Sequence, residues 1–228
     1  MHEGYEHAKR FPRTLTVRGT GRLAAKPDLI QVSVALNTRD KEYSAAMERA
    51  AAMQAALRDA LKPLGFERDE LKTLSLNVNA EYESVRDERN QYRQVFAGYV
   101  CRHDLQLEFG YDTKLLSEVL SAVSACVAEP ELRIGFTVKD REPLADELLR
   151  LASENARKKA AVLAAASGVS LGELLRVDYS EGASSFFSPT VYAESAGGAL
   201  KRNMAVDMDV EARDIELCED VTFVWRID

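Results

Sequence analysis

The sequence has 228 residues, of which 46% are hydrophobic and 29% are charged. This composition is typical of a soluble globular protein, long enough for one large domain or two small ones that associate closely. The formal net charge is −7, with both signs interspersed along the chain, which argues against a nucleic-acid partner. No run of 18 or more apolar residues occurs, so no transmembrane segment is expected.

The N-terminus, "MHEGYEHAKRFPRT", carries Glu3 and Glu6 and lacks the apolar stretch of a secretory signal peptide. We therefore expect a cytoplasmic location for the chain as written, with a leader already removed as the alternative. Residues 1–13 are expected to form a flexible N-terminal segment. The chain has three cysteines, too few for a disulfide framework or a CxxC metal site, and this usage fits a reducing compartment.

The elements follow from the spacing of apolar residues, since a period of two predicts strands and steps of three and four predict helices. Strands are predicted near 15–24 and at 30–36, 73–83, 94–109, 131–138, 173–181, 204–211 and 215–227, and helices at 41–62, 112–126 and 141–167. The order is ββαββ-αβαβββ. It predicts an α+β fold, with mainly antiparallel sheets and three amphipathic helices packed on one face of each sheet. The domain spans 14–227, as one body or as two closely associated halves, 14–110 and 111–227.

The first predicted strand contains Gly19-x-Gly21-x-x-Ala24, the spacing of a dinucleotide-binding turn. Such a turn requires a helix to begin at the second glycine, so that its N-terminal amides meet the phosphates. Here Pro27 interrupts, and the next element alternates as a strand. We interpret the two glycines as permitting a bulge or a close backbone approach near a sheet edge, and no cofactor is predicted.

One predicted strand has apolar residues where polar ones are expected. Along 94–109, Phe96 and Val100 fall on the otherwise polar face. Apolar side chains there indicate a second layer or a subunit contact. They are therefore candidates for an interaction surface in a homo-oligomer.

A long connection, 181–202, mixes small residues and proline with Phe186, Phe187 and Tyr192. Loops of this length in compact domains are often functional or mobile. The three aromatic residues extend the candidate interaction surface and suggest a protein partner. The alternative is an irregular excursion with a few residues packed down.

Candidates for chemistry are few. Cys101 and His103 share the apolar face of one strand; a Cys–His pair is catalytic when a carboxylate and an open cleft accompany it, but a core histidine is the commoner interpretation. Asp207, Asp209 and Glu211 place three carboxylates on one strand face, which can hold a hard cation but is more often solvated. We predict no catalytic, cofactor or metal site.

Several segments, taken in order, resemble the SIMPL-domain family over about 14–227. The matching residues are Val17, Gly19, Gly21, Pro27 and Asp28 in the opening pattern, Thr73 in an alternating strand, and Gly98 and Tyr99 in a Gly-Tyr strand. An alanine-rich third helix and the closing "CEDVTFVWRI" complete the likeness.

The resemblance implies that bacterial relatives are mostly envelope or secreted proteins linked to stress defence, some of them ring- or channel-forming oligomers, while a eukaryotic member is associated with a signalling kinase. It carries no established active site, so no catalytic residue is transferred. We therefore expect a non-enzymatic, self-associating protein, an oligomeric assembly or scaffold. The alternatives are a ligand- or protein-binding module that uses the 181–202 loop, and an enzyme that uses Cys101 and His103.

Overall fold

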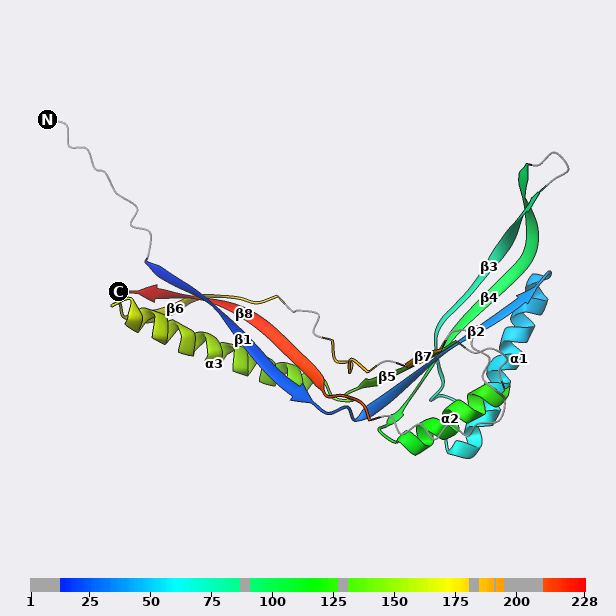
Figure 1. Ribbon diagram of the computed structural model, residues 1–228, viewed down its shortest axis with the longest axis horizontal. Coiled ribbons are helices and arrows are strands. Elements are labelled where there is room, and N and C mark those ends of the chain that lie inside the picture. The colour runs from blue at the N-terminus through cyan, green and yellow to red at the C-terminus, as the bar shows by residue number, and fades with distance from the viewer. Residues whose placement is uncertain (1–12, 87–90, 127–130, 181–184, 191, 195–210) are drawn as a thin grey trace. The chain divides into compact units, whose positions relative to one another are not determined.

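The computed structural model describes residues 13–86, 91–126, 131–180, 185–190, 192–194 and 211–228. Its elements, in chain order, are β1 (Thr14–Ala25), β2 (Leu29–Asp40), α1 (Tyr43–Leu61), the 3₁₀ turn η1 (Lys62–Leu64), β3 (Lys72–Arg86), β4 (Tyr92–Gly110), α2 (Thr113–Cys126), β5 (Glu131–Thr137), α3 (Glu142–Ala166), β6 (Leu171–Asp178), β7 (Tyr192–Glu194) and β8 (Ile215–Ile227) (Figure 1). The predicted α+β class and the order of elements are confirmed. The predicted strand 204–211 lies outside the described residues except for its last residue, and the short β7 lies within the predicted loop.

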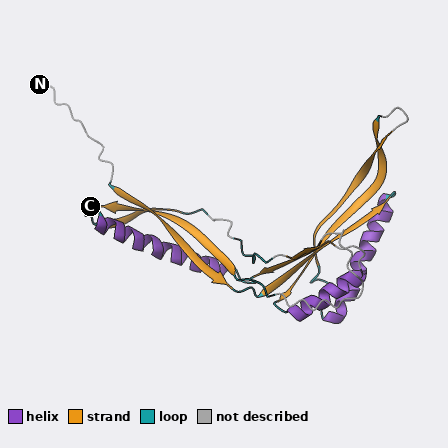
Figure 2. Cartoon of the chain, in the orientation of Figure 1, coloured by secondary structure: helices purple, strands orange, loops and turns teal. Residues whose placement is uncertain are grey.

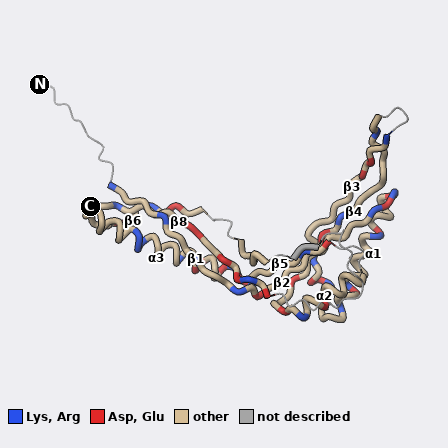
Figure 3. Tube along the Cα trace, in the orientation of Figure 1, with Lys and Arg blue, Asp and Glu red and all other residues tan. Residues whose placement is uncertain are grey.

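The strands form two antiparallel sheets, in the order β1-β8-β6 and β3-β4-β2-β5-β7. Each sheet has helices on one face: α3 lies along the first sheet, and α1 and α2 cover one face of the second (Figure 2). This follows from the alternation of apolar residues, which gives each central strand one buried face. Acidic and basic residues are interspersed along the trace (Figure 3).

The chain divides into two compact units. The first unit is drawn from Met1–Ala25, Asp140–Phe186 and Ile215–Asp228, and the second from Lys26–Lys139 and Phe187–Asp214. This division differs from the predicted halves, 14–110 and 111–227, because β1 pairs along its whole length with β8 from the other end of the chain. Each unit has a core of its own.

In the first unit, Gly19 and Gly21 bring α3 against β1. A Cβ at Gly19 would lie 2.0 Å from the backbone oxygen of Ala152, and one at Gly21 would lie 2.0 Å from that of Leu148. Since β1 is an edge strand, the predicted close backbone approach near a sheet edge is confirmed. The pairing of β1 with β8 has no register shift, and β2 follows β1, so neither a bulge nor a phosphate-binding helix occurs there.

Local residues mark the boundaries of two helices. The Asp112 carboxylate accepts hydrogen bonds from the backbone N–H groups of Lys114 and Leu115, at 2.9 and 3.0 Å, and so caps α2. Pro143 stands in the first turn of α3, and Gly168, with a φ of 68°, follows its end.

Candidate interaction surface

A bulge in β4 decides which side chains share a face at the far end of the second sheet. Glu81 of β3 pairs with Gly98, but the next residue, Tyr82, pairs with Phe96, so that Ala97 is left unpaired. Because two residues on β4 oppose one on β3, the inside–outside alternation of β4 is inverted beyond this point.

The inversion places Phe96 on the helix-covered side of the sheet. Its ring lies 5.2 Å from that of Tyr99, and Tyr99 packs against the buried cluster that contains Ala46 of α1. Val100 follows Tyr99 in a regular stretch of β4, pairs with Asn79, and points to the opposite face. The prediction that Phe96 and Val100 share a face was therefore wrong, since the sequence pattern assumed an unbroken strand.

Four rings now form one row, which we call the aromatic face: Tyr43, Tyr99, Phe96 and Tyr82. Successive ring centroids are 5.7, 5.2 and 5.8 Å apart, all with edge-on geometry, which is the favourable arrangement for aromatic pairs. Tyr43 is 54% exposed, Phe96 44% and Tyr82 58%. The rings are thus held in place by one another while large parts of them remain open to solvent.

The aromatic face lies where the sheet narrows. Pairing of β2 with β4 ends at Asp40 and Tyr99, whereas β3 and β4 continue together as a two-stranded ribbon (Figure 1). A two-stranded ribbon in water is marginally stable at best. Exposed aromatic residues on such a ribbon are the composition expected at a protein–protein interface.

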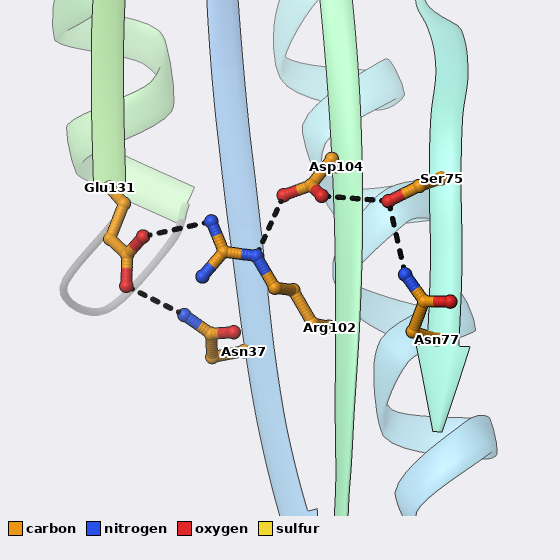
Figure 4. Close-up of polar contacts among 6 residues, drawn as sticks. All are labelled: Asn37, Ser75, Asn77, Arg102, Asp104 and Glu131. Carbon is orange, nitrogen blue, oxygen red and sulfur yellow. Dashed lines mark hydrogen bonds and ion pairs between the residues drawn. The ribbon is translucent and has the colours of Figure 1, made fainter. Parts of the chain in front are cut away.

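The opposite, helix-free face of the second sheet carries a polar network (Figure 4). The Arg102 guanidinium on β4 hydrogen-bonds Asp104 at 3.1 Å and reaches across β2 to pair with Glu131 on β5 at 3.2 Å. Ala35 of β2 lies in register with both carboxylate residues. The small side chain of Ala35 leaves room for this bridge.

Hydroxyl and amide groups complete the network. The Ser75 hydroxyl donates to Asp104 at 2.7 Å, and the Asn37 amide donates to Glu131 at 3.0 Å. A hollow of about 520 Å³ lies over these strands. The ion pairs of Arg102 with Asp104 and Glu131 are partly exposed. Such pairs contribute about 0–1 kcal/mol each to the stability of the fold. Among the described residues that line the hollow, none is a histidine that could serve as a base for Ser75. The sequence showed polar residues here, but not which strands are neighbours.

Cys101 and His103 lie on the helix-covered face of β4. Cys101 is fully buried, and burial raises the pKa of its thiol against a smaller lowering by a hydrogen bond with Thr38. His103 is 5% exposed, and its Nε2 lies 2.9 Å from the Thr73 hydroxyl oxygen. Burial lowers the pKa of His103, and Arg58 lowers it further, whereas Asp104 raises it. A buried thiol with a raised pKa is a poor nucleophile, so this geometry favours a core histidine.

Within the described residues 185–190 of the 181–202 loop, Phe187 and Ser188 contact β5. The Phe187 ring lies 3.3 Å from the position of a Cβ on Gly135, and its backbone bridges to Thr137. The Ser188 N–H donates to the carbonyl of Phe136 at 2.8 Å. Phe187 thus makes a contact within its own unit, while it remains 38% exposed.

The other residues predicted in that region are only partly described. The Phe186 ring is half-buried, with the Arg141 guanidinium 5.7 Å from its centroid. Tyr192 begins β7, but its side chain lies outside the described part of the chain, as do 181–184, 191 and 195–202. An interaction role for the three aromatic residues stays a prediction.

The predicted carboxylate row is also incomplete, because Asp207 and Asp209 lie outside the described residues while Glu211 is exposed. Within the described ranges, no three His, Cys, Asp or Glu side chains are placed to hold a metal ion. In the same ranges, no helix has both the length and the hydrophobicity to cross a membrane.

Two antiparallel sheets, each with helices on one face, define an α+β protein, and its second sheet carries an exposed aromatic row. The family model described as "SIMPL: Protein of unknown function (DUF541)" matches residues 15–225. The chain therefore belongs to the SIMPL family, as the sequence resemblance predicted.

Two curated relatives are similar to this chain. The 26 kDa periplasmic immunogenic protein of Brucella melitensis is 26% identical over 169 residues, which cover 73% of this chain and 66% of that protein. The uncharacterized protein YggE of Edwardsiella ictaluri is 27% identical over 161 residues, covering 71% of this chain and 65% of that protein. The match thus spans slightly less than two thirds of each relative.

Proposed function

We propose that this chain is a non-enzymatic protein that self-associates through its aromatic face and acts as an oligomeric assembly or scaffold. The observation that carries the proposal is the row of edge-packed and largely exposed rings on a ribbon of two strands. Such rings lose little conformational freedom on binding because they already hold one another, and aromatic anchors dominate interface energies.

A second copy of the chain suits this surface because the row is uniform. When a two-fold axis places two such rows face to face, rings meet rings along the whole contact. None of the four side chains carries a charge, so contact between the rings themselves buries no like charges. The same rows would then shield the marginal ribbon from water.

The proposal is tested by changing one ring and measuring native mass by light scattering coupled to size exclusion over a wide concentration range. Phe96→Asp should shift the protein towards the 25.3 kDa monomer, with association weakened by about 2–4 kcal/mol, the cost of losing an interface anchor. Val95→Asp is the matched control, because Val95 is 50% exposed but precedes Phe96 in the strand and points to the other face.

The control should keep the mass of the unaltered chain. A monomer at every concentration would refute self-association. If Phe96→Asp leaves the mass unchanged, the contact lies elsewhere on the molecule.

We also propose an envelope location, because the Brucella relative is named a periplasmic protein, although the N-terminal residues predict a cytoplasmic one. Fractionation of cells of the source organism, with antibody detection, decides between them. Recovery with cytosolic markers would contradict the envelope location. The stress-related role implied by the family stays part of this proposal, and loss of the gene should then lower survival under stress conditions.

A further inference from the structure

His103 occupies an unusual place beneath α1. It is almost fully buried on the helix-covered face of the second sheet, paired in register with Leu36 of β2 and Leu76 of β3. Its Nε2 lies 2.9 Å from the Thr73 hydroxyl oxygen, within hydrogen-bond distance. This contact suits a neutral ring, because one ring nitrogen can donate to or accept from the hydroxyl without a charge.

The charged group that faces His103 from α1 is Arg58, another cation. The Nε atom of Arg58 is buried and has no hydrogen-bond partner among the described residues. From β3 the ring meets the Thr73 hydroxyl, and from β2 the apolar Leu36. Asp104 is next to His103 in β4, but it lies on the other face and is held by Arg102 and Ser75.

A proton on His103 would therefore place a buried positive charge beside the half-buried Arg58. Burial and Arg58 both lower the pKa of His103 below its ordinary value, so the ring gains a proton more readily when α1 is displaced and water enters. The closed state is favoured above the ordinary histidine pKa of about 6.5, and this advantage is lost as the pH falls below that value.

Displacement of α1 would act directly on the aromatic face. Tyr43 is the first residue of α1, and its contact with Tyr99 forms one end of the row. The same end of the helix is held by a hydrogen bond of 2.9 Å from the Thr38 hydroxyl to the carbonyl of Ala46. When α1 leaves the sheet, Tyr43 leaves the row with it.

We propose that His103 and Arg58 make the packing of α1 on the second sheet sensitive to acid, an arrangement that we call the clamp. As the environment is acidified, α1 is released from the sheet and assembly through the aromatic face weakens. This inference rests on the proposed function for its effect on assembly. The clamp itself is a property of the second unit and can be measured separately.

The test follows two readouts on the full-length chain from about pH 7.5 to about pH 5. Hydrogen exchange gives protection factors for the amides of α1, corrected for the intrinsic pH dependence of exchange. Light scattering gives the native mass. Because one proton is taken up on opening, protection in α1 should fall by at most about tenfold per pH unit below about pH 6.5, and the mass should fall over the same interval.

Three variants assign the effect. His103→Gln keeps a polar partner for Thr73 without a titrating group and should abolish the acid loss. Arg58→Met keeps the length of the side chain but removes the facing cation, and should make the total acid loss smaller. A double variant, His2→Gln with His7→Gln, removes the chain's other two histidines and should leave the acid loss unchanged.

Constant α1 protection and mass over this pH range would overturn the inference, as would an acid loss that persists in His103→Gln. If His103→Gln does not fold, an acid loss in Arg58→Met as large as that of the unaltered chain overturns it as well. A chain that is monomeric at neutral pH refutes the proposed function, and the exchange data then decide the clamp alone.

Discussion

Gly19 and Gly21 show how two missing side chains fix the position of a helix. At either site a Cβ would meet the backbone of α3 at 2.0 Å, a distance that no side-chain rotation can relieve. Facing them, α3 presents the buried row Leu148, Ala152, Ala156, Ala160 and Ala164. The glycines of β1 and the four alanines of this row therefore permit contact between backbones rather than between side chains.

We expect Gly21→Ala to lower the free energy of unfolding by about 3 kcal/mol, because α3 must move away from β1 to accommodate the new methyl group. Chemical denaturation measures this. Gly110→Ala is the matched control, since no atom lies within 4 Å of its added Cβ, and its effect should stay within about 0.5 kcal/mol. Equal stabilities of the two variants would show that α3 is not held by this approach.

Cys101 illustrates how burial decides reactivity. Its thiol is inaccessible and its pKa is raised by burial, whereas Cys218 of β8 is exposed. We expect iodoacetamide at neutral pH to modify Cys218 within minutes and Cys101 only after unfolding. Peptide mass spectrometry of the native and denatured protein measures the extent of alkylation at Cys101 and at Cys218. Rapid alkylation of native Cys101 would instead support the enzyme alternative with His103.

At the scale of elements, the bulge in β4 does most to shape the candidate site. It depends on Gly98, whose φ of 149° is unfavourable for a residue with a side chain, and where a Cβ would lie 2.6 Å from the backbone oxygen of Asp40. The bulge turns Phe96 towards Tyr99 and so completes the aromatic face.

Replacing Gly98 by Ala should therefore affect both stability and assembly. We expect a loss of about 2–3 kcal/mol in unfolding free energy from backbone strain and the contact with Asp40. Association should weaken as well, since Phe96 would no longer be held beside Tyr99. Denaturation and light scattering check the two effects. Unaltered association in a destabilised Gly98→Ala protein would show that the bulge is not needed for the aromatic face.

The helices and the regular strands could be predicted because their signals are local: Asp112 caps α2, Pro143 opens α3 and Gly168 ends it. The bulge could not be predicted in this way. Alternation along β4 is compatible with either face for Phe96 until its partners on β3 are known, and one unpaired residue reverses every assignment beyond it.

At the scale of the whole molecule, the order of strands in the sheets decides which residues can meet. β1 and β8 come from opposite ends of the chain and pair over all twelve residues of β1. β2 lies between β4 and β5, which brings Arg102 and Glu131 within 3.2 Å across Ala35. The local sequence pattern indicates neither of these strand arrangements, because strand pairing joins segments that are distant in sequence.

The sequence by itself determined the α+β class, the order of the elements and the family, and it narrowed the role of the paired glycines to a bulge or a close approach, since these depend on local patterns of periodicity and residue size. The tertiary structure alone decided the division into two units, the joining of Tyr43, Tyr99, Phe96 and Tyr82 into one exposed row, and the burial of His103 beside Arg58. These features depend on strand register and on which helix covers which face. Both are set by contacts between distant segments, which compete through packing and hydrogen bonding over the whole fold.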